Sequence, residues 1–165
     1  MTEPFQPAQP SPPSDTQWSP GGPTGPRAGF WRRLAAVIID GLIVGVVAGA
    51  LGGIGAAVDS TGLIVVGYLV WLVGYAAYEI YFHGSSSGQT VGKRALGIRV
   101  VDFATGGPIG YGRATIRWVG RFISGLLCYL GYLWMLWDKE KQTWHDKMAN
   151  DVVVPTDAYP VDHWP

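Results

Sequence analysis

The sequence has a single cysteine and few charged residues. One thiol can form neither an intramolecular disulfide nor a thiolate metal cluster, and Cys128 lies in an apolar stretch that suits a buried hydrophobic residue. Charged residues make up 15% of the 165 residues, below the roughly 25% of soluble domains. The formal net charge is zero. Because phosphate binding needs a basic excess, this balance argues against a nucleic-acid partner.

The first 28 residues lack any apolar run. Eight of the chain's 12 prolines fall there, and such a composition cannot bury a core. We predict a disordered, Pro-rich tail over residues 1–28 that acts as a spacer, with a ligand for PxxP-binding modules as the alternative. A secretory signal peptide would need a basic start and an early apolar stretch. We therefore expect the tail to be retained and the first apolar run to act as an anchor.

Two long apolar runs dominate the rest of the chain. Residues 34–58 contain one charged residue, Asp40, and residues 62–82 contain one, Glu79. Each run is long enough to cross a hydrocarbon core of about 30 Å. Only residues 59–61 separate the runs, so we predict an antiparallel transmembrane hairpin.

Basic residues flank this hairpin at one end. Three arginines fall within residues 27–33 and three basic residues within 93–99, whereas the link carries only Asp59. The positive-inside rule then places the N-terminal tail and the loop after residue 82 in the cytoplasm. We interpret Arg94, Arg99, Arg113 and Arg117 as orientation charges that touch anionic lipid.

Four glycines recur at four-residue intervals in the first run. Small residues at this spacing let a second membrane helix approach closely. We expect this stripe to pack against Gly67 and Gly74 of the second run, with self-association of two copies as the alternative. The stripe consists of Gly41, Gly45, Gly49 and Gly53.

A third apolar segment, residues 114–137, is interrupted by Arg117 and Arg121. The remainder falls short of a comfortable span at about 1.5 Å per residue. Short β-branched stretches at 97–102 and 151–154 could pair only if both lie on one side of the membrane. We therefore predict an all-α membrane protein: a transmembrane helical hairpin plus a third bent or re-entrant apolar helical segment, with a small cytoplasmic β pairing. A full third crossing is the alternative.

The loop after the second run holds a glycine-rich motif. A phosphate-binding loop would need glycine at position 87 and serine or threonine at position 94, where this chain has Ser87 and Arg94. The motif is therefore not interpreted as a nucleotide site, and no cofactor is expected. Its residues are Gly88, Gln89, Thr90, Gly92, Lys93 and Arg94.

Three segments resemble the RDD family of bacterial membrane proteins: WRRLAAVIID, GQTVGKRALGIRVVD and WHDKMANDVVV. The family is named for an arginine and two aspartates, which match Arg33 (with Arg32 as the adjacent alternative), Asp40 and Asp146. Members often have proline where this chain has Val91.

The resemblance covers residues 29–154 and leaves 155–165 as a C-terminal tail. It implies a multi-pass protein of the bacterial plasma membrane. It also implies a transport role, which is usually proposed for the family.

Asp40 and Glu79 carry the functional hypothesis. In an antiparallel hairpin both lie in the cytoplasmic half of the membrane, where two carboxylates can share a proton or hold a small cation. This predicts a component of small-ion or proton-coupled transport, and a homo-oligomer, because two helices cannot enclose a pathway. The alternative is a membrane anchor or scaffold that recruits an unknown cytoplasmic protein, with Arg33 and Asp40 as a structural ion pair in the bilayer.

An enzyme is not expected. His145 beside Asp146 resembles an acid/base pair, but no nucleophile or metal set accompanies it in the sequence. We expect Asp146 to pair instead with a lysine or arginine at the membrane surface.

Overall fold

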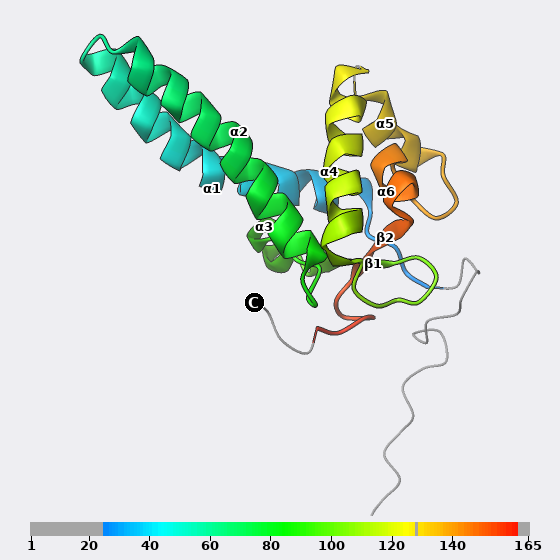
Figure 1. Ribbon diagram of the computed structural model, residues 1–165. Coiled ribbons are helices and arrows are strands. Elements are labelled where there is room, and N and C mark those ends of the chain that lie inside the picture. Colours follow the sequence, from blue (N-terminus) through cyan, green and yellow to red (C-terminus); the bar gives the residue numbers. More distant parts are fainter. Residues whose placement is uncertain (1–24, 128, 162–165) are drawn as a thin grey trace, which may run out of the picture.

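The computed structural model describes residues 25–127 and 129–161 (Figure 1). The predictions for Cys128, for most of the Pro-rich tail and for residues 162–165 lie outside the described residues.

Two long helices form a hairpin that extends away from the rest of the chain (Figure 1). Helix α1 spans Phe30–Ala57 and helix α2 spans Thr61–Gly84. The turn between them needs Asp59 at a positive φ of 50°, and Ser60 caps α2 by accepting a hydrogen bond from the Leu63 amide. Both helices are long and apolar enough to cross a membrane. The two predicted helices are confirmed, with α1 beginning four residues before the expected position 34.

Close packing within the hairpin uses glycines other than the predicted stripe. A Cβ added at Gly67 would lie 3.1 Å from the Gly52 amide nitrogen and 3.3 Å from the Ala48 carbonyl oxygen. By contrast, a Cβ at Gly41, Gly45, Gly49, Gly53 or Gly74 would meet no described atom within 4 Å. The prediction that the stripe packs against α2 is therefore wrong, because a different face of α1 meets α2. Self-association through the stripe stays a prediction.

The third apolar segment is bent. Helix α4 spans Gly110–Leu126, followed by the short helix α5 (Leu130–Leu133) and the 3-10 turn η2 (Trp134–Leu136). The chain direction bends by 113° between the two parts. The arginines expected to interrupt this segment lie inside α4 and on its buried side.

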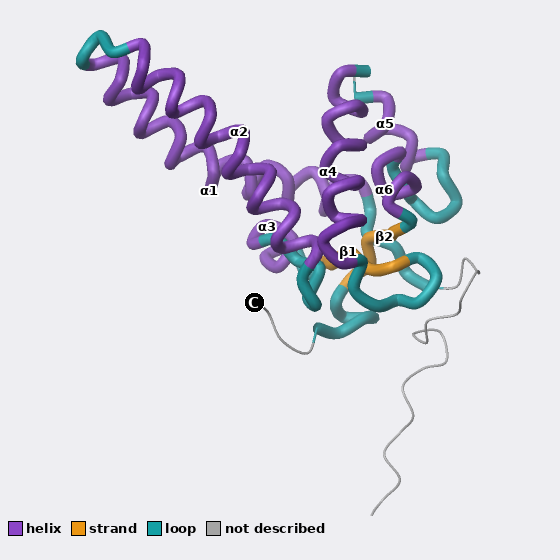
Figure 2. The backbone as a smooth tube through the Cα atoms, viewed as in Figure 1, coloured by secondary structure: helices purple, strands orange, loops and turns teal. Residues whose placement is uncertain are grey.

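A two-stranded antiparallel sheet joins two distant segments at one end of the hairpin (Figure 2). Strand β1 (Ile98–Asp102) pairs with β2 (Asp151–Pro155), so that Val100 lies opposite Val153. This confirms the predicted pairing, which β-branched residues favour. Two short helices precede the strands: α3 (Val91–Ala95) before β1 and α6 (Trp144–Ala149) before β2.

We refer to residues 85–155 as the base. Its core is apolar and small, and includes Ile98, Val100 and Val153, which are fully buried together with Ala36 of α1. Helix α4 packs between α2 and α6. The far tip of the hairpin carries only the short turn, whereas strands and longer loops gather at the base (Figure 2). The base is therefore where side chains from distant segments meet.

Candidate functional site

Arg33 joins the start of α1 to the end of the base. Its Nη1 donates to Asp146 Oδ2 at 2.6 Å, its Nη2 to the Lys141 carbonyl at 2.8 Å and its Nε to the Ala28 carbonyl at 3.2 Å. The interpretation of Arg33 and Asp40 as an ion pair is therefore wrong. Arg32, the adjacent alternative, is exposed.

Asp146 is the centre of this ion network. Besides Arg33 it contacts Arg117 Nη1, and it forms a capping box with Thr143 at the start of α6. Burial alone would raise the pKa of the Asp146 carboxyl, but Arg117 and Arg33 outweigh it and hold that pKa well below its usual range. The expected partnership of Asp146 with a lysine or arginine is confirmed, but in a buried position.

Asp151 shares the same guanidinium nitrogen. Arg117 Nη1 contacts Asp151 Oδ1 as well as Asp146. Burial raises the pKa of Asp151 to about 7, with Arg117 opposing the rise and Asp146 adding to it. One cation therefore serves two carboxylates, and Asp151 is the weaker partner.

Asp40 fixes the glycine-rich motif to α1. Its Oδ1 accepts hydrogen bonds from the Gly92 amide at 2.7 Å and the Tyr78 hydroxyl at 2.7 Å, and its Oδ2 accepts one from Thr90 Oγ1 at 2.6 Å. A Cβ at Gly92 would lie 2.2 Å from the Ala36 carbonyl oxygen. Glycine is needed there because the two backbones nearly touch.

Other motif residues hold the loop against β1. Gly88 has a positive φ of 62°, and a Cβ there would lie 2.1 Å from the Val100 carbonyl oxygen. Gln89 Nε2 donates to the Ile98 carbonyl at 3.0 Å. Arg94 is exposed, whereas Lys93 is buried. The motif thus acts mainly as a folding device, with Lys93 directed elsewhere.

Glu79 belongs to a separate cluster. Its Oε2 pairs with Arg121 Nη1 and lies 3.2 Å from His83 Nδ1. Within the described residues, Glu79 Oε1 and His83 Nε2 are buried without a hydrogen-bond partner. The two carboxylates of the predicted ion or proton site, Asp40 and Glu79, therefore have different partners.

Arg117 and Arg121 are the residues whose role the sequence interpretation missed. Both are buried in α4, so the interpretation of Arg117 as a lipid-facing charge is wrong. The signal was the four-residue spacing of Arg113, Arg117 and Arg121, which puts all three on one side of a helix. A face that holds arginines inside an otherwise apolar segment indicates buried carboxylate partners.

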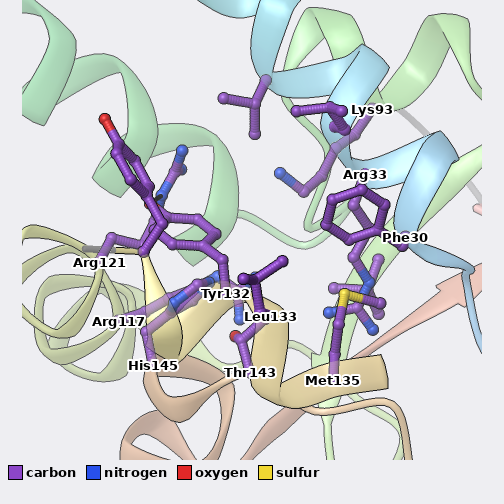
Figure 3. A pocket seen from close by; sticks show the side chains of 14 residues that line it. Phe30, Arg33, Lys93, Arg117, Arg121, Tyr132, Leu133, Met135, Thr143 and His145 are labelled. Carbon is purple, nitrogen blue, oxygen red and sulfur yellow. Dashed lines mark hydrogen bonds between the residues drawn. The ribbon is translucent and has the colours of Figure 1, made fainter. Parts of the chain in front are cut away.

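A cavity of about 270 Å³ lies between α1, α4 and α5 (Figure 3). Lys93 and Arg33 lie on one side of it, and Arg117, Arg121 and His145 on the other. Apolar side chains, including Phe30, Leu34, Val37, Leu133 and Met135, form much of the remaining lining.

The sequence profile of the RDD family matches residues 27–150. The chain belongs to the RDD family. Its signature residues thus form two internal contacts: Arg33 with Asp146, and Asp40 with the motif loop. Membership and the two long apolar helices together suggest a membrane protein.

Curated relatives share part of this chain. A proline-rich antigen homolog of Mycobacterium tuberculosis is 40% identical over 88 residues, which is 53% of this chain and 34% of that protein. The proline-rich antigen of Mycobacterium leprae is 34% identical over 93 residues, 56% of this chain and 34% of its own length. The chain therefore spans about a third of these two relatives.

A third relative matches over nearly its whole length. The uncharacterized protein YxaI of Bacillus subtilis is 28% identical over 147 residues, which covers 77% of this chain and 96% of YxaI. No solved structure matches the chain.

Proposed function

We propose that this chain is a non-enzymatic, multi-pass protein of the bacterial plasma membrane that serves as an anchor or scaffold. In this proposal α1 and α2 cross the bilayer, the bent segment of α4 and α5 enters it without crossing, and the N-terminus and the two-stranded sheet lie on the cytoplasmic side. The clustering of basic residues at the base end of the hairpin supports this orientation. The base would then present its exposed loops, together with the Pro-rich tail, to a cytoplasmic protein partner.

The observation that carries the scaffold role is the saturation of the signature residues. Asp40 accepts three hydrogen bonds, all from its own chain. Arg33 donates to three acceptors, also within the chain. A carboxylate that carries an ion or proton must exchange partners, whereas a saturated one fixes structure. The signature is therefore best explained as the connection that builds the base onto α1.

Ion- or proton-coupled transport is the second candidate, and it is favoured by a different residue. Glu79 lies on α2 with Oε1 unpartnered within the described residues, and His83 next to it is unpartnered at Nε2. Ionisable groups of this kind inside a membrane often mark a proton path. Under this candidate Glu79 and His83 exchange the proton, while Asp40 remains structural.

Flux measurements on proteoliposomes separate the two candidates. We expect the wild-type protein to show no proton, sodium or potassium flux above that of protein-free vesicles. Glu79→Gln and Asp40→Asn are the informative variants, and Arg32→Ala is the matched control because Arg32 is exposed. Wild-type flux that Glu79→Gln abolishes, in protein that remains folded, would overturn the scaffold proposal in favour of transport.

A further inference from the structure

The cavity beside Arg33 holds a buried cation that forms no ion pair within the described residues. Lys93 is 4% exposed, and the nearby carboxylates of the described residues form their ion pairs with arginines or histidine and not with its ammonium. Its backbone amide is used to close the start of α3 on Thr90. A buried, unpaired ammonium is costly, so such a group indicates an anion that completes the site.

Charged groups of both signs surround this cavity. Four cations line it: Arg33, Lys93, Arg117 and Arg121. Asp146 pairs with Arg33 and Arg117. Asp151 pairs with Arg117, and Glu79 pairs with Arg121. Each arginine of the lining therefore has an ion pair, whereas Lys93 forms none within the described residues, and Glu79 and Asp40 act on it from a longer distance.

Two further polar atoms of the lining are unsatisfied. Arg117 Nε and His145 Nδ1 are buried and have no hydrogen-bond partner in the described residues. Both side chains lie across the cavity from Lys93 (Figure 3). These side chains form the polar part of the lining contributed by α4 and α6.

The rest of the lining is apolar. Phe30, Leu34, Leu133 and Met135 face a volume of about 270 Å³, far above the roughly 10–15 Å³ of such space that a single water needs. That volume suits an acidic head and a short stretch of hydrocarbon. Leu34 and Tyr129 of the lining are also surface residues, 38% and 64% exposed, so a chain has a route out between α1 and α5.

We propose that this cavity binds the acidic head and first chain segment of a single-chain amphipathic anion, a fatty acid or an alkyl phosphate, with Lys93 as its ion-pair partner. This inference goes beyond the proposed scaffold role and is tested independently of ion flux. Burial lowers the pKa of the Lys93 amine to about 8, so the ammonium form is present at neutral pH and binding weakens as pH rises through that value. The charged groups that act on Lys93 are Glu79, Arg121, Arg117 and Asp40, and His145 faces it across the cavity.

Photo-labelling of the full-length chain in lipid nanodiscs tests the proposal. The probe is decanoate with a diazirine close to the carboxylate, on the chain segment that the cavity would hold, and labelled residues are located by mass spectrometry. We expect labels on α1 and α5 residues of the cavity, and at least tenfold less labelling in Lys93→Met. Lys93→Arg should restore most of it, and the matched control Lys147→Met should label like wild type because Lys147 is a surface residue paired with Asp138.

Competitors identify the ligand chemistry. Decyl phosphate should compete with the probe, whereas decanol and inorganic phosphate should not. Competition by inorganic phosphate as strong as by decyl phosphate would overturn the amphipathic ligand in favour of a free anion. Equal competition by decanol would overturn the anion requirement.

A second variant protects the test against misfolding. Leu133→Trp fills the cavity without removing a charge, and it should also abolish labelling of the cavity. Wild-type labelling in both Lys93→Met and Leu133→Trp, or labels confined to residues outside the cavity, would contradict the proposal.

Discussion

The hairpin and the base differ in what covers their apolar side chains. On the hairpin, Val46 and Tyr68 are 71% and 72% exposed, so only the surroundings, such as lipid, can cover them. In the base, Val100 and Val153 are fully buried by other parts of the same chain. The comparison shows that the sheet end of the base has an internal core, whereas the hairpin, like the outer faces of α4 and η2, leaves large apolar side chains uncovered by the chain itself.

The carboxylates of the hairpin helices are covered by the base. Asp40 and Glu79 lie on the hairpin helices, yet both are buried against the base: Asp40 on α3 and Glu79 on Arg121 of α4. An isolated carboxylate in a membrane helix costs on the order of 2.5–3.5 kcal/mol on insertion scales. Here the base supplies hydrogen bonds to Asp40 and a counter-charge to Glu79. These contacts explain how the apolar helices tolerate the two carboxylates.

The largest effect is expected where the ion network of the base is broken. Asp146→Ala leaves Arg33 and Arg117 buried without their shared acceptor, and should lower the free energy of unfolding by roughly 3–5 kcal/mol. Circular dichroism during titration with SDS measures this loss in the purified protein. Lys147→Ala is the matched control, because it breaks the more exposed ion pair with Asp138 from its exposed side and should cost less than about 1 kcal/mol. Equal losses would contradict the account.

A smaller loss is expected at the contact between α1 and α3. Gly92→Ala places a methyl group against the Ala36 carbonyl and should cost about 1–3 kcal/mol of unfolding free energy, as overpacking usually does. Gly53→Ala is the control, since a Cβ there meets no described atom within 4 Å. A large effect of Gly53→Ala on the molecular mass in detergent would instead support self-association through the glycine stripe.

Asp151→Asn should have a small and pH-dependent effect. The pKa of Asp151 is raised by burial to about 7 in the folded chain, against about 3.9 in unfolded chains. Its stabilising contribution is therefore present at low pH and is lost as pH rises through about 7. The melting temperature of Asp151→Asn should therefore rise relative to that of wild type between about pH 3.9 and about pH 7. Melting curves at several pH values measure this difference. A melting temperature of the variant that falls further below that of wild type as pH rises would contradict this assignment.

The smallest effect is expected on the exposed face of the hairpin. Val46→Ala should change the unfolding free energy in detergent by less than about 0.5 kcal/mol, because Val46 contacts little of its own chain. Val153→Ala, its matched control in the core of the base, should cost at least about 1 kcal/mol. Similar losses at both positions would remove the distinction between the two regions.

The elements that the sequence predicted are those with local signals. The apolar runs predict α1 and α2 by their length, and the β-branched stretches at 97–102 and 151–154 predict the sheet. The partners of Arg33 were not predictable in this way. Helical spacing relates Arg33 to Asp40 in the same helix, whereas the actual partner, Asp146, lies 113 residues further along the chain.

The four-residue spacing of the glycine stripe predicted the wrong packing face of α1 for a related reason. Helix α1 carries small residues on more than one face, and the face that packs on α2 uses Ala48 and Gly52. The cavity was also beyond sequence reasoning, because its lining comes from α1, α3, α4 and α5 and from the segments after them. Lys93 was noticed only as part of a motif, and its burial depends on how these elements meet.

A double-mutant cycle on Arg33 and Asp146 tests the central claim most directly. The claim is that the family signature stabilises the fold by an internal ion pair between α1 and the base. Unfolding free energies of Arg33→Met, Asp146→Asn and the double variant give the coupling energy. We predict large losses in both single variants and a coupling energy of about 1–3 kcal/mol. Additive losses, with no coupling between the two positions, would contradict the account.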